Sequence, residues 1–128
     1  MSVQPVALLV EDDALLVLQI EDEFTDAGFE IYSALHGTAA IAEIDSDPTQ
    51  FFCLVTDIRL GTPIDGWAVA RHARLKSPEI IVVYITGDSS AAWKTEGVPD
   101  SILLNKPLWP GQLSAVVIDL VNKRNQVA

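Results

Sequence analysis

The chain has 128 residues, of which 49% are hydrophobic, and this length fits one compact domain, for which about 100–150 residues are usual. Eighteen acidic residues against eight basic ones give a net charge of −10, which excludes the attraction to phosphate backbones that drives nucleic-acid binding. Because no apolar run approaches the ~20 residues of a membrane span and the N-terminus lacks a signal-peptide pattern, we expect residues 1–128 to form one cytoplasmic domain without a membrane partner.

Five short apolar runs alternate along the chain with segments of helical periodicity. The runs are rich in Val, Ile and Leu and apolar on both faces, as strands of a parallel sheet covered on both sides must be. They are Val6–Val10, Ile31–Ala34, Phe52–Thr56, Ile80–Ile85 and Ile102–Leu104.

The first two helices are indicated by their capping residues and by where their apolar spacing stops. Asp13 is a suitable N-cap for a helix with apolar residues at three- and four-residue spacing up to Phe24, and Gly28 is a suitable stop signal. The second helix is predicted from about Thr38 to Ile44, and the polar cluster Asp45–Pro48 is expected to end it.

Two further helices follow in the second half of the chain. One is predicted to start near Asp65-Gly66 and to end at Ser77-Pro78, because a residue before proline avoids helical geometry. The last is predicted to open with Pro110 in its first turn and to continue through Val121. Strands that alternate with helices, joined by right-handed crossovers, predict an α/β fold with a doubly wound parallel sheet.

Charged and hydroxyl side chains stand where the apolar runs end. Glu11 and Asp12 follow the first run, Asp57 the third and Thr86 the fourth, and Lys106 follows the fifth and precedes a proline. Each is commonplace alone, as a cap, a turn residue or a solvated lysine. The carboxyl ends of parallel strands meet at one edge of a sheet, however, so we expect all of them to share a crevice.

This set of residues suits magnesium and phosphoryl chemistry. Mg²⁺ prefers carboxylate, water and phosphate oxygens, which predicts Asp12 and Asp57 as direct ligands and Glu11 as a ligand through water. Lys106 can pair first with an acceptor carboxylate and then with phosphoryl oxygens, while Thr86 offers a hydroxyl donor. Positive charge and donors are then placed where charge spreads during phosphoryl transfer. We therefore predict Asp57 as the nucleophile.

Five motifs, each at a strand end or at the start of a helix, together resemble one family over essentially the whole chain, the receiver domain of two-component response regulators. They are Leu-Leu-Val-Glu-Asp-Asp at 8–13, Thr-Asp-Ile-Arg-Leu at 56–60, Asp-Gly at 65–66, Thr-Gly at 86–87 and Lys-Pro-Leu at 106–108. The resemblance implies a flavodoxin-like fold, with five parallel strands in the order 2-1-3-4-5 and five helices. It also implies the Arg59 backbone carbonyl as a metal ligand and a cis Lys106-Pro107 peptide.

The resemblance further implies a signalling role in place of an enzymatic one. A histidine kinase or a histidine phosphotransfer protein would supply a phosphoryl group to Asp57 in the presence of Mg²⁺. The domain would then signal to a downstream protein partner or pass the phosphoryl group on, and a phosphorylation-dependent dimer is compatible with this. Self-phosphorylation from small donors and autodephosphorylation belong to the same chemistry. If the sequence is a piece of a longer regulator, an output domain is missing from it.

Three other protein classes fit this sequence less well. A haloacid-dehalogenase-like phosphatase needs a second aspartate two residues after the nucleophile, where this chain has Arg59. A flavodoxin-like flavin binder needs phosphate-binding donors after its first strand, whereas Glu11 and Asp12 would repel a phosphate. A phosphorylation-independent interaction domain of receiver shape is disfavoured by the intact Asp57 and Lys106, and a phosphorylation assay decides it.

The chain departs from the family in two places. Many receivers carry Tyr or Phe three residues before the lysine, where this chain has Leu103, so any switch must be conveyed through backbone and packing. The segment Ser89–Asp100 contains Gly97 and Pro99, which predicts a short or mobile fourth helix. No metal or catalytic role is predicted for the two histidines, and Cys53 is expected to be a buried strand residue.

Overall fold

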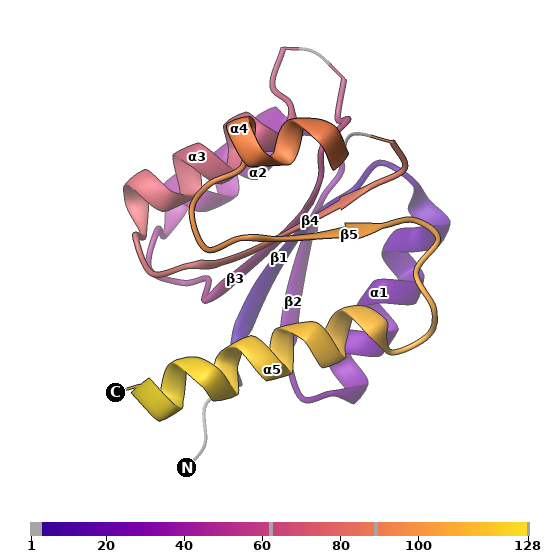
Figure 1. Cartoon of the computed structure of the whole chain (residues 1–128), viewed down its shortest axis with the longest axis vertical. Helices are drawn as coiled ribbons and strands as arrows, with labels where there is room; N and C mark the ends of the chain where they lie inside the picture. The colour runs from indigo at the N-terminus through magenta and orange to yellow at the C-terminus, as the bar shows by residue number, and fades with distance from the viewer. Residues whose placement is uncertain (1–3, 62, 89, 128) are drawn as a thin grey trace.

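The computed structural model describes residues 4–61, 63–88 and 90–127. It contains one five-stranded parallel sheet in the order β2-β1-β3-β4-β5, as expected (Figure 1). The strands are β1 (Val6–Val10), β2 (Glu30–Ala34), β3 (Cys53–Asp57), β4 (Ile81–Thr86) and β5 (Ile102–Asn105). Each boundary lies within one residue of the boundary predicted from the apolar runs.

Helices cover both faces of the sheet. They are α1 (Ala14–Asp26), α2 (Gly37–Ser46), α3 (Gly66–Lys76), α4 (Trp93–Glu96) and α5 (Gln112–Val127), with a 3-10 turn, η1 (Ser90–Ala92), before α4. In Figure 1, α1 and α5 lie on one face, and α2, α3 and α4 lie on the other. Within the described residues, no helix has both the length and the apolar character needed to span a bilayer.

Alternate residues of the central strands point into two separate cores. Leu8, Leu54 and Val82 pack with α2 and α3, while Leu9 and Val83 pack with α1 and α5. All five are fully buried. This two-faced burial explains why the strands are continuous apolar runs and not alternating polar and apolar sequences.

The predicted helix caps are confirmed in the first half of the fold. Asp13 Oδ1 accepts hydrogen bonds from the amides of Leu15 (3.0 Å) and Leu16 (3.3 Å), and α1 is followed by Gly28 at φ +96°. A left-handed residue directly after a helix is the position that glycine occupies at least cost. Asp65 caps α3 by accepting a hydrogen bond from the Ala68 amide at 2.9 Å.

The end of α2 and both ends of α5, which continues to Val127 beyond the predicted Val121, differ from the sequence prediction. Helix α2 continues to Ser46, two residues past Ile44, and the Ser46 hydroxyl donates a hydrogen bond to the Glu43 carbonyl at 2.8 Å in the last turn. The last helix starts at Gln112, so the prediction of Pro110 inside its first turn is wrong. Pro110 lies in a turn that ends at Gly111, whose φ of +82° lies outside the right-handed helical region, so the helical residues begin after it.

The segment between β4 and β5 contains little helix, as its sequence predicts, and hydrogen bonds attach it to the sheet. Helix α4 is a single turn of four residues. The amide of Val98 donates to the hydroxyl of Tyr84 in β4 at 3.1 Å, and the indole of Trp93 donates to the Ser101 hydroxyl at 2.9 Å. The side chain of Tyr84 is fully buried beside Trp67. This tyrosine therefore fastens a loop that has little secondary structure of its own.

Replacing Tyr84 by phenylalanine should destabilise the fold. The change keeps the buried ring but leaves the Val98 N–H without an acceptor, which costs about 1–3 kcal/mol. Urea unfolding of the variant measures this loss. Tyr32→Phe is the matched control, because the Tyr32 hydroxyl donates only to the exposed Glu30, and it should change stability by less than about 0.5 kcal/mol. Equal losses in the two variants would contradict the role given to Tyr84.

Candidate functional site

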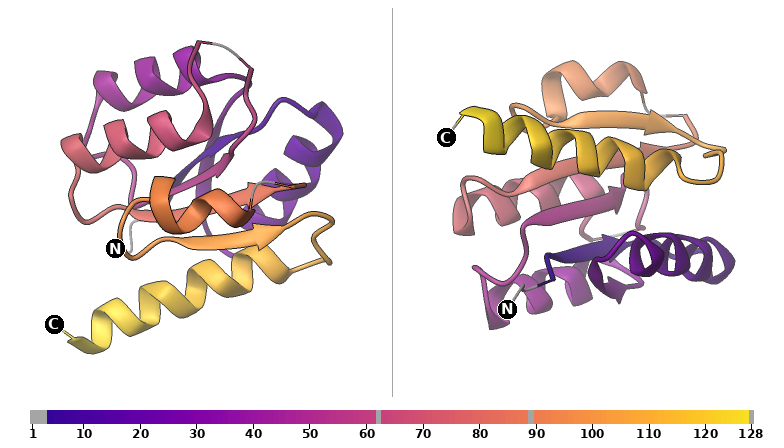
Figure 2. Two further views of the ribbon diagram at one scale, coloured as in Figure 1. Left: turned by 45° about the horizontal axis from the view of Figure 1, so that its top comes forward. Right: turned by 90° about the horizontal axis from the view of Figure 1, so that it is seen from below.

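Strand register brings the predicted residues to one edge of the sheet. Val10 pairs with Thr56, so Glu11 and Asp57 follow at the same level on β1 and β3. Asp57 pairs with Ile85, and Thr86 pairs with Asn105, so Thr86 and Lys106 come next along the same edge. The right-hand view of Figure 2 shows the arrowheads of β3 and β5 pointing the same way. The register therefore assembles the site.

Lys106 connects two of the carboxylates. Its Nζ lies 2.9 Å from Glu11 Oε1 and 2.9 Å from Asp57 Oδ2. The Glu11 side chain is fully buried and Asp57 is 7% exposed, whereas 27% of the Lys106 side chain remains accessible. The Lys106 amide donates a hydrogen bond to the Thr86 carbonyl, and the peptide bond between Lys106 and Pro107 is cis. The expected cis bond is confirmed.

Backbone amides hold the other oxygens of the site. Glu11 Oε2 accepts a hydrogen bond from the Asp13 amide at 3.1 Å, and Asp57 Oδ1 accepts one from the Arg59 amide at 3.2 Å. The Thr86 hydroxyl, on a residue that is 1% exposed, accepts one from the Asp88 amide at 3.2 Å. Each polar side chain is thus oriented by a residue two positions further along its own loop.

Burial and pairing shift the proton affinities of the buried glutamate and the lysine. Burial raises the pKa of Glu11, and the nearby negative charge of Asp57 adds to this, while hydrogen bonds from Lys106 and from the Asp13 amide oppose it. Burial alone would lower the pKa of Lys106, but its hydrogen bonds to Glu11 and Asp57 outweigh burial and raise it. Lys106 is therefore cationic across the physiological range.

The carboxylates are placed to share a metal ion. One oxygen each from Glu11, Asp12 and Asp57 lies within 4.8 Å of the others. Glu11 Oε1 is buried and pairs with Lys106 Nζ at 2.9 Å, and within the described residues it has no second partner. A buried oxygen with spare lone pairs and two neighbouring carboxylates is a donor set that fits Mg²⁺ or another hard divalent cation.

Steric constraints explain why the Asp-Gly motif at 65–66 has a glycine at its second position. A Cβ on Gly66 would lie 2.1 Å from the Asp57 carbonyl oxygen, so a side chain cannot fit there. The Gly66 amide donates to the Ile58 carbonyl at 2.8 Å, and Asp65 caps the helix that begins at this point. Helix α3 therefore starts directly against the backbone of Asp57 and supports it.

The structure brings Glu11, Asp12, Asp57 and Lys106 together, as the sequence predicts, and places Thr86 on the adjacent strand end. Sequence reasoning missed Asp88. The signal available was an acidic residue two positions after the threonine, which mirrors Arg59 two positions after Asp57.

The two histidines lie outside this cluster. His36 caps α2 by accepting a hydrogen bond from the Ala39 amide, and His72 Nε2 lies 2.7 Å from Asp45 Oδ1 at hydrogen-bonding distance. Cys53 is fully buried in β3, as expected, and burial raises the pKa of its thiol to about 12. A thiol that is protonated and buried is chemically inert.

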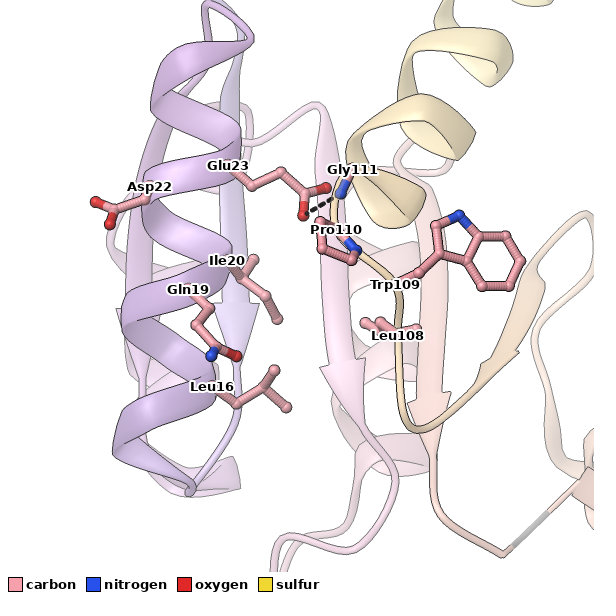
Figure 3. Close-up of a pocket in the computed structure, with 9 residues that line it drawn as sticks. All are labelled: Leu16, Gln19, Ile20, Asp22, Glu23, Leu108, Trp109, Pro110 and Gly111. Atoms are coloured by element: carbon pink, nitrogen blue, oxygen red, sulfur yellow. Dashed lines mark hydrogen bonds between the residues drawn. The ribbon is translucent and has the colours of Figure 1, made fainter.

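A hollow lies between α1 and the loop that leads into α5 (Figure 3). It has a volume of about 530 Å³ and is lined by Leu16, Gln19, Ile20, Asp22, Glu23, Leu108, Trp109, Pro110 and Gly111. In Figure 3, Glu23 reaches across it from α1 while Asp22 points away. Glu23 accepts hydrogen bonds from the amides of Gly111 (3.3 Å) and Ser114 (2.6 Å), so it caps α5 from another helix. Trp109, at the rim, is 67% exposed.

Comparison with known proteins gives one consistent result. The family model described as the response regulator receiver domain matches residues 7–118. An uncharacterized transcriptional regulatory protein, YrkP of Bacillus subtilis, is 30% identical over 113 residues, which are 87% of this chain and 47% of that protein. The chain thus spans about half the length of this curated relative.

Solved structures agree with the family match. A response regulator receiver protein from Sinorhizobium medicae is 42% identical with a TM-score of 0.89, over 94% of this chain and 97% of that one. The chemotaxis protein CheY4 of Vibrio cholerae is 21% identical with a TM-score of 0.81, over 91% of this chain and 98% of that one, and it shows the shared fold alone.

The raised pKa of Glu11 predicts a pH-dependent effect of Glu11→Gln in metal-free solution. A carboxyl whose folded pKa is raised favours its protonated form in the fold, so this contribution is present below the ordinary value of 4.5 and is lost as pH rises through the raised pKa. Glutamine imitates the protonated form. The variant should therefore be more stable than the wild type at neutral pH, and the difference should vanish in acid.

Urea unfolding across pH with a chelator present checks this prediction. Glu79→Gln changes an exposed glutamate and serves as the control. A Glu11→Gln variant that is less stable than the wild type at neutral pH would show that the Lys106 pair outweighs the cost of burying Glu11.

Proposed function

Because this chain belongs to the response regulator receiver domain family, we propose that it accepts a phosphoryl group on Asp57 and transmits that event as a signal. The observation that carries the proposal is the contact of Lys106 Nζ with both Glu11 and Asp57, beside the triad of carboxylate oxygens. An acceptor carboxylate, a cation and a metal-type donor set are the parts that phosphoryl transfer onto an aspartate requires.

Asp57 is the proposed acceptor because one of its oxygens is already paired with Lys106 and the other is held by a backbone amide. These contacts hold the carboxylate in one orientation at the strand end. Orientation is a large part of catalysis in phosphoryl transfer, since the protein's main tasks are positioning and charge stabilisation.

Glu11, Asp12, Asp57 and the Arg59 backbone carbonyl are the proposed ligands for Mg²⁺. When bound, the metal supplies positive charge to the phosphoryl oxygens and reduces repulsion among the carboxylates. Glu11 is buried and paired with Lys106, whereas Asp12 is exposed, so Asp12 is the carboxylate that can adjust to an incoming ion. These residues thus combine one rigid and one adaptable acidic side chain.

Lys106 and Thr86 are the proposed stabilisers of the transferred group. Lys106 keeps its charge because its pKa is raised, and its long side chain reaches Asp57 across the end of β4. Thr86 offers a hydroxyl on the strand between them. The oxygen of this hydroxyl accepts a hydrogen bond from the Asp88 amide, and a hydroxyl can donate its own hydrogen at the same time, so a hydrogen bond from Thr86 to a phosphoryl oxygen would connect the transferred group to the loop after β4.

The donor is proposed to be a histidine kinase or a histidine phosphotransfer protein, with a small phosphodonor as substitute. The signal is proposed to pass to a protein partner, to a dimer mate or to an output domain in a longer protein. Residues 1–128 then act as a single receiver domain in the cytoplasm, where such kinases present their phosphohistidine.

Asp57→Asn should abolish phosphorylation. Incubation with acetyl phosphate and Mg²⁺, followed by borohydride trapping and intact-mass spectrometry, should show one modification on the wild type and none on the variant, because an amide cannot accept the group. Asp119→Asn removes an exposed carboxylate on α5 and should remain fully labelled. Equal labelling of Asp57→Asn and the wild type would refute the acceptor assignment.

Loss of Asp12 should weaken Mg²⁺ binding more than loss of Glu11. A water-mediated contact costs about 10–100-fold in metal affinity when removed, and a direct ligand costs more. Calorimetric titration of Asp12→Ala and Glu11→Ala measures both, with Asp47→Asn as an exposed control. Mg²⁺ should also raise the melting temperature of the wild type, because it binds the folded state preferentially. An inverted order of the two alanine variants would reject the ligand assignment.

A further inference from the structure

The residue at the N-cap of α5, Gly111, has no side chain with which to cap the helix. It directly precedes the first helical residue, and its carbonyl already accepts a hydrogen bond from the Ala115 amide at 3.1 Å. Its φ of +82° is a conformation that glycine adopts at little cost. The first amides of a helix have no partner within the helix, so those of α5 need an acceptor from elsewhere.

Glu23 on α1 supplies that acceptor with both of its carboxylate oxygens. Oε2 accepts a hydrogen bond from the Ser114 amide at 2.6 Å, and Oε1 accepts one from the Gly111 amide at 3.3 Å (Figure 3). In a capping box, the amides at these two positions are bound by two side chains of the helix itself. Here one carboxylate from another helix binds both, and its negative charge suits the positive end of the helix dipole.

A short loop, residues 107–110, separates Lys106 from this contact. The Trp109 amide donates to the Gln112 side chain, and the Gln112 amide donates back to the Trp109 carbonyl, each at 3.1 Å. These two bonds join the loop to the first residue of α5. Because the loop is short and internally bonded, a displacement of Gly111 is passed on to Lys106.

Helix α1 connects the two groups that hold Lys106 and its loop. The helix follows Asp13, whose amide donates to Glu11 Oε2 at 3.1 Å, and Glu23 lies near its other end. It contains no glycine or proline, so it is a stiff connection. The ion pair between Lys106 and Glu11 therefore closes a ring of contacts that runs along α1, through Glu23 and back along the loop.

We propose that Glu23 is a positioning residue for Lys106. By fixing the start of α5 against α1, it keeps the Lys106 ammonium beside the carboxylates of Glu11 and Asp57. The inference deepens the proposed function and rests on it, because Lys106 stabilises a transferred group only while its Nζ stays close to Asp57. A misplacement of about 1 Å can slow an oriented reaction by up to ~10²-fold.

Glu23→Gln removes half of the contact with little change in shape. A side-chain amide offers one acceptor oxygen, and its NH₂ group cannot accept from a second N–H. Either Gly111 or Ser114 therefore loses its partner, and the charge at the helix start is lost as well. Asp22→Asn is the matched control, because this exposed neighbour loses the same charge but points away from the hollow in Figure 3.

The first arm of the test follows amide hydrogen exchange in the free protein without metal. In Glu23→Gln, the amides of Ser114 and Lys106 should both exchange about 3–10-fold faster, because one opening releases both. In the wild type, Lys106 should exchange faster than Val55 of the central strand, which marks that opening as local. Asp22→Asn should leave these rates unchanged.

Two results of this arm would overturn the inference. One is faster exchange at Ser114 with unchanged exchange at Lys106, which would limit the role of Glu23 to the helix it caps. The other is exchange of Lys106 only at the rate of Val55, which would mean that the loop opens only when the whole protein unfolds.

The second arm measures labelling by acetyl phosphate at saturating Mg²⁺. Glu23→Gln should lower the maximal rate about 2–5-fold, because Lys106 acts on charge that develops during transfer. The donor concentration for half-maximal rate should change less. A purely structural role would reduce the folded fraction without slowing the folded molecules. A maximal rate equal to that of the wild type, or an equal loss in Asp22→Asn, contradicts the inference.

The two arms separate this inference from the proposed function. If the wild type takes up no label but the exchange of Ser114 and Lys106 responds together, the proposed function fails and the link between Glu23 and Lys106 stands. If the wild type is labelled, and Glu23→Gln changes neither the exchange of Lys106 nor the maximal rate, the link fails and the proposed function is unaffected.

Discussion

The arrangement of the site depends on the ion pair between the buried carboxylate of Glu11 and the ammonium group of Lys106. Glu11 is removed from water at the end of β1, where an ionised group is costly, and Lys106 is the cation that compensates it. Lys106 directly follows β5, whereas Asp57 is the last residue of β3, and β4 lies between these two strands. Only a long side chain crosses that distance, so the sheet order and the length of lysine are matched. The surrounding loops are arranged about this cluster.

The regular part of the fold could be predicted from the sequence because its signals are local. Apolar runs mark the strands, and Asp13 and Asp65 mark helix starts through bonds to amides two or three residues away. The site could also be predicted, since strand ends in a parallel sheet must meet. Pro110 was misplaced because a remote side chain, Glu23, caps α5, and nothing near Pro110 in the sequence announces it.

The contacts that sequence reasoning missed join residues far apart in the chain or in separate loops. Tyr84 and Val98 are one case, and Arg59 and Asp88 are another. The Tyr84 contact also concerns position 103, where many receivers carry an aromatic residue and this chain carries Leu103. Tyr84 is the register partner of Leu103, so an aromatic hydroxyl is present on the neighbouring strand, where it fastens the loop before β5. Propensity and periodicity carry no information on such pairs, because they describe one element at a time.

The meeting of the strand ends at one edge of the sheet has a consequence for the order of folding events. Asp57 and Lys106 are 49 residues apart, and their meeting requires β4 to be inserted between β3 and β5. Contacts of such long range close late, because loop-closure entropy must be overcome first. A chain that has collapsed without completing its sheet therefore has neither a compensated Glu11 nor an oriented Asp57. The arrangement of the site thus depends on completion of the whole sheet, and no part of the chain shorter than the stretch from β1 to Lys106 can form it.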